Sequence, residues 1–279
     1  MKVGISACSN GHLPEWQDQI TELEQVLNNM NIETALSPHI IRTIDEYSGT
    51  DKERAEALMR FYADDSIEAI YDISGGDLAN GVLKYLDYDT IAKVGKTFWG
   101  YSDLTTVINA IFAMTGKSSV LYQIKNMVYS KSDLQQKRFS SYLSGKESEL
   151  LDFNYDFIQG NQMEGIIVGG NIRCLLKLAG TKYWPDMKGK ILLLESLGGE
   201  SGQIATLFSQ LDHMGVFDQV AGVLLGTFTE YEKADLEFSV FDLLKMHINN
   251  TLPVASTREI GHGNDSKAII IGKGMLLHK

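Results

Sequence analysis

Short apolar runs alternate with amphipathic stretches through the first half of the chain. Apolar side chains recur every three or four residues over 15–30, as on one face of a helix, whereas 69–73 forms a run typical of a buried strand. The predicted strands are 2–7, 32–36, 69–73 and 96–100, and the predicted helices are 15–30, 52–63, 78–86 and 103–114. Thr50 is the predicted N-cap of one helix. This alternation predicts a parallel sheet with helices on both faces, a three-layer α/β arrangement.

The second half has more glycine turns and a less regular alternation. Aliphatic runs at 165–168, 190–194 and 221–226 predict buried strands, and 206–214 and 240–248 predict helices. Between the halves, 131–143 is polar and helical in character, and 145–156 is acidic and irregular. We therefore expect two domains: an N-terminal α/β domain over 1–145 and a smaller C-terminal mixed α/β domain over 160–279.

Composition and charge exclude several classes of protein. Of the 279 residues, 44% are hydrophobic and 22% are charged, which is ordinary for a globular protein. The formal net charge of −11 argues against nucleic acid or an anionic membrane as the main partner, because both would be repelled. No window approaches the roughly 18 apolar residues of a membrane helix. The residues before Cys8 lack the apolar stretch of a signal peptide, so we expect a cytoplasmic location.

The two cysteines, Cys8 and Cys174, lie far apart in the sequence and are predicted to be buried, reduced thiols. Closely spaced cysteine or histidine pairs are missing, so the sequence gives no support for a structural zinc site.

The most informative stretch is Phe98-Trp99-Gly100-Tyr101-Ser102-Asp103-Leu104. An apolar strand ends at a glycine, and Ser102 stands on the turn before a helix. Such a turn pushes the serine hydroxyl out of the sheet, and the N–H of Asp103 would point at an oxyanion beside it. The alternative is an ordinary helix N-cap. The Gly-x-Ser-x-Gly pattern of α/β-hydrolases is not met, because position 104 is leucine.

Three further positions could take part in the same chemistry. Gly75-Gly76 lies between a strand and a helix, where its N–H groups could face a bound group or simply form a turn. Glu195 ends an aliphatic strand, and His262 lies in a glycine-flanked turn. Each could be structural when taken alone. Taken together, the three residues supply the parts of a catalytic triad. Ser102 would be the nucleophile, His262 the base, and Glu195 the carboxylate that orients the base. Spacing alone does not bring them together.

Two long blocks resemble the LD-carboxypeptidase and microcin C immunity protein family of serine peptidases. The first spans 48–116 and contains Gly75-Gly76, a tyrosine-leucine-aspartate segment at 85–89, and Gly-Tyr-Ser-Asp at 100–103. The second begins at EGIIVGGNIRCLLKLAGTKYWPDMKGKILLLES and continues with QLDHMGVFDQVAGVLLGTF. The order and spacing of these blocks cover most of the chain.

The resemblance implies a Ser102–Glu195–His262 catalytic triad, with an oxyanion hole made by the N–H groups of Gly76 and Asp103. It also implies a parallel-sheet N-terminal domain, a smaller barrel-like C-terminal domain, a cleft between them, and a homodimer. A metal or organic cofactor is not expected. The sequence departs from the family pattern at Asp77, at Ser196 and before His262, and Glu200 is a second candidate for the triad carboxylate.

The activity implied is hydrolysis of an L,D-peptide bond, with release of terminal D-alanine from murein tetrapeptides during cell-wall recycling. The alternative is the immunity branch, which cleaves an amide between a peptidyl or aminoacyl group and a nucleotide-like leaving group. Trp184 is a candidate for stacking on a base in that case, and a core tryptophan otherwise. A third hypothesis is a binding module that kept the fold and lost turnover.

Overall fold

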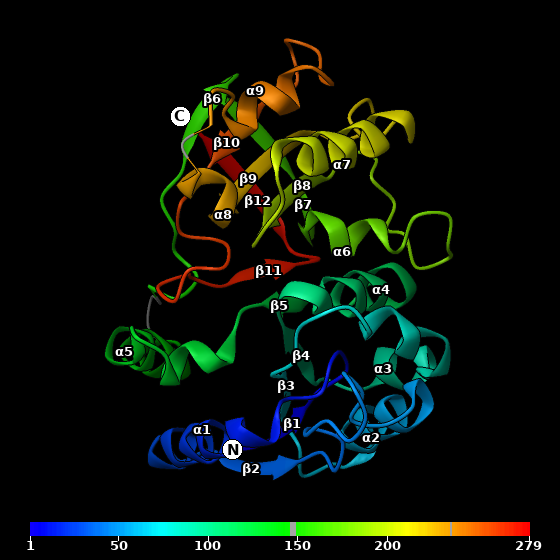
Figure 1. The fold of residues 1–279 in the computed structure, drawn as a ribbon, viewed down its shortest axis with the longest axis vertical. Helices are drawn as coiled ribbons and strands as arrows, with labels where there is room; N and C mark the ends of the chain where they lie inside the picture. Colours follow the sequence, from blue (N-terminus) through cyan, green and yellow to red (C-terminus); the bar gives the residue numbers. More distant parts are fainter. Residues whose placement is uncertain (146–148, 235) are drawn as a thin grey trace.

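The computed structural model describes residues 1–145, 149–234 and 236–279. Two six-stranded sheets organise it, and each is built mainly from one half of the chain (Figure 1). The predicted irregular segment at 145–156 falls partly outside the described residues. No helix within the described ranges is both long and apolar enough to cross a membrane.

The first sheet has the strand order β11-β5-β4-β3-β1-β2. Its strands are β1 (Lys2–Ser6), β2 (Glu33–Leu36), β3 (Ala69–Asp72), β4 (Thr97–Gly100), β5 (Ser119–Leu121) and β11 (Ile269–Ile271). All neighbours are parallel except β11, which runs antiparallel to β5. The short strand β5 and the late strand β11 were not predicted, because three-residue strands are too short to show a pattern.

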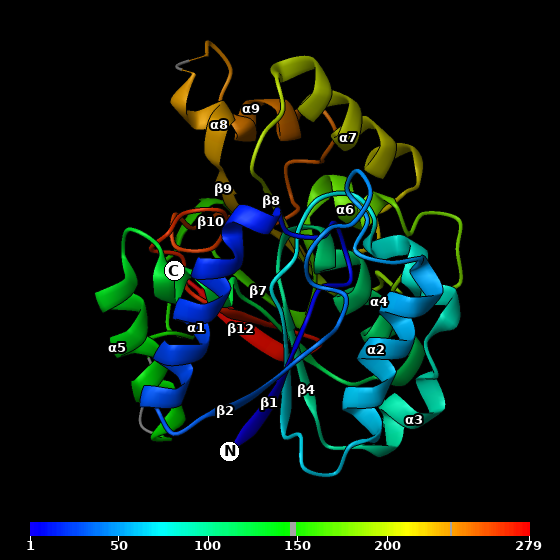
Figure 2. The same ribbon diagram turned by 60° about the horizontal axis from the view of Figure 1, so that its bottom comes forward.

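Helices cover both faces of this sheet (Figure 2). Helices α1 and α5 pack on one face, and α2, α3 and α4 on the other. Their bounds, with those of the 3₁₀ helices, are η1 (Pro14–Trp16), α1 (Gln17–Asn29), α2 (Asp51–Ala63), η2 (Ala79–Tyr85), α3 (Tyr88–Lys93), η3 (Ser102–Leu104), α4 (Thr105–Thr115), η4 (Ile124–Val128) and α5 (Ser132–Leu143). The predicted three-layer arrangement is confirmed.

Local sequence accounts for several of these elements. Helix α1 buries Ile20, Leu23 and Leu27 on one stripe, as its periodicity predicts. Thr50 caps α2 through a capping box with Glu53. The stretch predicted as a helix at 78–86 forms the 3₁₀ helix η2, which contains Gly81, a poor α-helix former packed against the Asp51 carboxylate.

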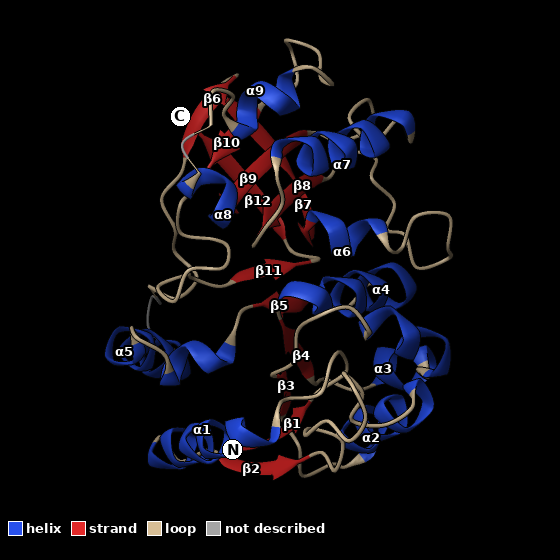
Figure 3. Ribbon diagram, in the orientation of Figure 1, coloured by secondary structure: helices blue, strands red, loops and turns tan. Residues whose placement is uncertain are grey.

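The second sheet has the order β12-β7-β8-β9-β10-β6, with parallel central strands and antiparallel edges. Figure 3 shows its strands crossing behind a layer of helices. Its elements are β6 (Asp156–Gln159), β7 (Gln162–Asn171), α6 (Ile172–Leu176), β8 (Ile191–Ser196), α7 (Ser201–His213), β9 (Gly222–Phe228), α8 (Thr229–Lys233), α9 (Val240–Lys245), β10 (Val254–Ser256) and β12 (Gly274–His278). Strand β8 is buried along its whole length, as its aliphatic run predicts. The sheet curls into a half-barrel, which confirms the predicted mixed α/β fold.

The two halves are joined by more than a linker. The last segment of the chain first adds β11 to the first sheet and then β12 to the second. Between them, the N–H of Gly272 donates to the Ile167 carbonyl at 2.8 Å, and the Ile167 N–H donates to Lys273 at 3.0 Å. The late segment therefore connects both sheets.

Asn109 of α4 makes a second connection, to β7. Its side-chain amide donates to the Gly169 carbonyl at 2.9 Å and accepts from the Gly169 N–H at 2.8 Å. The residue is fully buried. Both polar groups of Gly169 thus depend on a side chain from the other half of the molecule.

Asn109→Leu is expected to lower the free energy of unfolding by about 2–4 kcal/mol, because it leaves two buried backbone groups of Gly169 unpaired. Urea denaturation followed by circular dichroism measures this. The matched control is Asn28→Leu on the exposed face of α1, which should change stability by less than about 0.5 kcal/mol. Equal effects at the two positions would contradict a connecting role for Asn109.

Candidate active site

Ser102 lies on a sharp turn between β4 and α4. Tyr101 is extended, with φ −154°, and Ser102 then takes a left-handed φ of +54° as η3 begins. The N–H of Leu104 donates to the Tyr101 carbonyl at 2.9 Å and closes the turn. A left-handed non-glycine residue is a strained conformation that is typical of functional sites. The predicted strand–turn–helix setting of Ser102 is present.

His262 connects Ser102 to Glu195. Its Nε2 lies 3.2 Å from the Ser102 hydroxyl oxygen, and its Nδ1 lies 2.6 Å from Glu195 Oε2. Glu195 is the last residue but one of β8 and is fully buried. Within the described residues, its other oxygen, Oε1, has no hydrogen-bond partner. The three residues predicted as a triad therefore form one continuous contact, drawn from both halves of the molecule.

Neighbouring groups fix the position of the His262 ring. The Tyr101 ring centroid lies 4.5 Å from that of the imidazole, at 53°. Burial, and then the charge of Glu195, raise the pKa of the Tyr101 hydroxyl, so that ring stays neutral. Gly261 has φ +146°, and a Cβ there would collide with Thr227. The turn before His262 thus requires glycine, which lets it approach β9 closely.

Glu200, the second candidate for the triad carboxylate, has a different position. It is the N-cap of α7, where it forms a capping box with Gln203. The N–H of Glu200 donates to the Gln203 side chain at 2.9 Å. The carboxylate in contact with His262 is that of Glu195.

The Gly75-Gly76 loop lies beside Ser102 and is held by Asn10. The N–H of Asn10 donates to the Gly75 carbonyl at 3.2 Å, and its side-chain oxygen accepts from the Asp77 N–H at 2.8 Å. Gly76 has φ +121°, and a Cβ would overlap the Asn10 side chain. No described residue accepts a hydrogen bond from the Gly76 N–H. That N–H is therefore free for a ligand.

The Asp103 carboxylate has a structural role that the sequence did not indicate. It is fully buried and accepts hydrogen bonds from the Ser9 hydroxyl at 2.7 Å and the Ala79 N–H at 2.8 Å. Lys177, from the second half of the chain, pairs with it at 2.5 Å and also donates to Asp77. These bonds hold the turn that carries Ser102 against the Gly75-Gly76 loop.

A pocket of about 330 Å³ opens over Ser102 and His262. Its lining includes side chains that sequence reasoning missed: Asn10, His12, Trp16, Arg42, Lys125, Tyr129 and Leu197. The one available signal was Lys125, an isolated charge within the mostly apolar run 119–128. Trp184 does not line this pocket. It packs against the main hydrophobic core.

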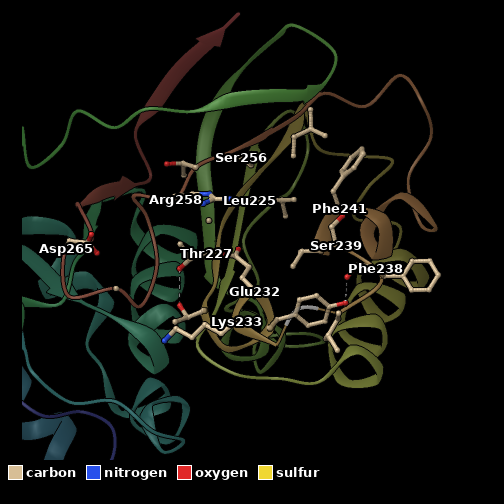
Figure 4. A pocket seen from close by; sticks show the side chains of 18 residues that line it. Leu225, Thr227, Glu232, Lys233, Phe238, Ser239, Phe241, Ser256, Arg258 and Asp265 are labelled. Atoms are coloured by element: carbon tan, nitrogen blue, oxygen red, sulfur yellow. Dashed lines mark hydrogen bonds between the residues drawn. The ribbon is translucent and has the colours of Figure 1, made fainter.

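A larger pocket of about 750 Å³ lies between β9, α8 and α9 (Figure 4). It contains none of the three predicted triad residues, although Gly263 reaches it. Its lining contains two carboxylates, Glu232 and Asp265, and two cations, Lys233 and Arg258, so the charges balance. Among the described residues, no cluster of three or more His, Cys, Asp or Glu side chains could hold a metal ion.

Comparison with known proteins identifies the family. The LD-carboxypeptidase N-terminal domain matches residues 3–122, and the LD-carboxypeptidase C-terminal domain matches residues 164–277. The chain belongs to the LD-carboxypeptidase family. The predicted family is thereby confirmed, and with it a peptidase activity.

Relatives of this LD-carboxypeptidase family member come from both branches. A probable murein peptide carboxypeptidase of Bacillus subtilis is 29% identical over 237 residues, which cover 81% of this chain and 73% of the relative. The microcin C7 self-immunity protein MccF of Escherichia coli is 26% identical over 259 residues, covering 81% of this chain and 75% of the relative. The chain is similar to both, so this comparison does not choose between their substrates.

Solved structures agree on the fold. MccF in its apo state superposes with a TM-score of 0.88 at 22% identity, covering 100% of this chain and 96% of that one. A muramoyltetrapeptide carboxypeptidase from Oxalobacter formigenes superposes with a TM-score of 0.84 at 22% identity, and the match covers 99% of this chain and 95% of that one. The two-sheet architecture is thus that of other family members.

The strain at Ser102 predicts an unusual stability order. Ser102→Gly should be more stable than Ser102→Ala by about 1 kcal/mol, because only glycine relaxes in a left-handed conformation. Thermal or urea unfolding of the two variants measures the difference. The same pair at Ser140, inside α5, should give the opposite order by a similar amount. Equal stability of the two Ser102 variants would show that the turn is not strained.

Proposed function

We propose that the protein is a serine carboxypeptidase that hydrolyses an L,D-peptide bond and releases terminal D-alanine from murein tetrapeptides. The observation that carries this proposal is the bridge from Ser102 through His262 to Glu195. A nucleophile, a base and a buried carboxylate in this order are the groups that catalyse acyl transfer in serine hydrolases. Membership of the LD-carboxypeptidase family supports the choice of bond.

In the proposed reaction, the Ser102 hydroxyl attacks the scissile carbonyl while His262 Nε2 takes its proton. Nδ1–H donates to Glu195 Oε2, which fixes the tautomer and stabilises the imidazolium. Among the described residues, only His262 is hydrogen-bonded to the Glu195 carboxylate, so that carboxylate is available to stabilise the imidazolium. His262 then protonates the leaving amine, and water releases the acyl group by the reverse sequence of proton transfers.

The negative charge of the tetrahedral intermediate needs donors already in place. We assign the N–H of Gly76 and the N–H of Asp103 to this oxyanion hole. The free Gly76 N–H beside Ser102 and the position of Asp103 at the start of η3 support this. One such donor contributes about 3 kcal/mol to the transition state in comparable enzymes.

The immunity-type reaction is the competing proposal for the same site. MccF has been solved in complex with glutamyl sulfamoyl guanosine, an aminoacyl-nucleotide analogue. The base-stacking role considered for Trp184 has no support, because that side chain packs outside the pocket over Ser102. The cytoplasmic location and the homodimer stay predictions from the sequence.

Mass spectrometry of N-acetylated murein tetrapeptides incubated with the protein tests the proposal. Wild-type protein should release D-alanine, and Ser102→Ala should lower the rate by about 10⁵-fold or more while the fold is kept. Glu195→Gln should lower kcat by about 10³–10⁴-fold, since the imidazolium loses its carboxylate. Glu200→Gln is the matched control and should stay within about twofold of the wild type.

The same assay with an aminoacyl sulfamoyl nucleotide separates the two proposals. Cleavage of the nucleotide without cleavage of either a lysine or a diaminopimelate tetrapeptide would move the protein to the immunity branch. If the Ser102→Ala variant cleaved any of these substrates at the rate of the wild type, the serine mechanism would be contradicted.

A further inference from the structure

The pocket over Ser102 is positively charged in a protein that is strongly acidic. Its lining contains Lys125 and Arg42, and none of its described lining residues is Asp or Glu. The whole chain carries a formal net charge of −11. An acidic surface repels anions, so an anionic group is held here only if the pocket supplies its own cations. The larger pocket of Figure 4 has balanced charges and so does not favour an anionic group.

Lys125 is a buried cation without a carboxylate partner. Only 7% of the residue is exposed, and its ammonium lies 5.4 Å from the Trp16 ring centroid and 6.0 Å from that of Tyr129. No ion pair or hydrogen bond joins this ammonium to any residue the structure describes. Two aromatic faces compensate a buried charge only in part, so the arrangement costs stability.

Nearby titratable groups leave the charge of Lys125 in place. The Asp72 carboxylate, whose charge acts on Lys125, already accepts hydrogen bonds from Ser6, Cys8 and Ser74. Burial, followed by the charge of Lys125, lowers the pKa of His12 to about 3, so this histidine is neutral and its Nε2–H donates to Ile73. Burial lowers the pKa of Lys125 to about 8, and Asp72 opposes that shift. Lys125 is thus protonated at neutral pH.

Arg42 provides a second cation in the lining of this pocket. Its Nε donates to the Gly11 carbonyl at 3.3 Å, while its two terminal nitrogens have no hydrogen-bond partner among the described residues. A guanidinium fixed at Nε presents its remaining donors in a fork that matches a carboxylate.

The sheet topology places Lys125 on the same edge as Ser102. Strands β4 and β5 are parallel, with Gly100 opposite Leu121, so the residues that follow them leave the sheet together. Ser102 follows β4, and Lys125 follows β5 on η4. A carboxypeptidase leaves one amino acid beyond the scissile bond, so its carboxylate lies about one residue, roughly 3.8 Å, from the attacked carbonyl.

We propose that Lys125, assisted by Arg42, binds the terminal carboxylate of the leaving amino acid and so restricts cleavage to the last peptide bond. This assignment rests on the proposed carboxypeptidase function and names the residues that make it an exopeptidase. The Lys125 ammonium has no carboxylate partner among the described residues because, in this proposal, the substrate carboxylate is its partner. The two aromatic faces then hold the chain of Lys125 in place before the substrate arrives.

The test compares a tetrapeptide acid with the same tetrapeptide carrying a terminal amide. Wild-type protein should prefer the acid by about 100-fold in kcat/KM. Lys125→Met should lose about 50-fold on the acid and less than about threefold on the amide. Lys125→Arg should recover most of the preference. Lys84→Met is the matched control, because Lys84 also lies over a tyrosine ring, at 4.8 Å, but outside the pocket.

The pH dependence gives a readout that a structural role would not move. With N-acetylated acid substrate, wild-type kcat/KM should fall as pH rises above about 8, because Lys125 loses its proton there. In Lys125→Arg that fall should disappear, because a guanidinium stays charged to pH values above about 12. Equal losses on acid and amide for Lys125→Met would overturn the assignment.

A second probe keeps the assignment testable even if no tetrapeptide is cleaved. Two phosphonofluoridates that differ only in a terminal carboxylate or its methyl ester can be compared as labels of Ser102. Wild-type protein should react about tenfold faster with the carboxylate than with the ester, and Lys125→Met should react equally with both. Equal rates in the wild type would overturn the carboxylate site, whatever the fate of the peptide assay.

Discussion

His262 contacts Ser102 and Glu195 at the same time only while the two sheets keep one fixed position relative to each other. Ser102 belongs to the first sheet and Glu195 to the second, and the distances of 3.2 and 2.6 Å leave little room for movement. The structure fixes this relation at three places: β11 on β5, Asn109 on Gly169, and Lys177 on Asp103. Each is a polar or backbone contact, wholly or partly buried, where an unmade hydrogen bond is costly.

Backbone conformation, more than side-chain choice, builds the site between these contacts. Ser102 and Gly76 both have positive φ, and each lies where a parallel strand of the first sheet gives way to a helix or loop. Such conformations persist only when the surroundings determine them. Asn10 and the buried Asp103 carboxylate do so here, by bonding the loop and the turn to each other. The geometry of the candidate site is therefore a property of the loops held at one edge of the sheet.

The sequence was informative where a pattern is long or a residue type is rare in its setting. Helical periodicity predicted α1, the capping residue Thr50 marked the start of α2, and an aliphatic run predicted β8. Ser102 could be nominated because it stands on a strand-to-helix turn, Glu195 because it lies at the end of an aliphatic run, and His262 because glycines flank it. Their contact could not be derived, since it depends on a spatial relation that no local pattern encodes.

Other features could not be predicted from the sequence, again for physical reasons. Strands β5 and β11 have three residues each, too few to separate alternation from chance. The carboxylate of Asp103 reads as an ordinary helix-start residue until the lysine that pairs with it, 74 positions later, is brought beside it. Arg42 looks like a surface charge, and the apolar run around Lys125 marks this lysine as unusual without placing it. Only the parallel pairing of β4 with β5 brings Lys125 to the edge that carries Ser102.

The path of the late segment has a consequence for biosynthesis. Residues 269–278 supply β11 and β12, so both sheets lack an edge strand until these residues have left the ribosome. Up to that point β5 presents an open edge, which is a template for pairing with other chains. His262 precedes β11 by only a few residues and is anchored by the same segment. A growing chain therefore carries Ser102 and Glu195 long before it contains the segment that anchors His262 between them.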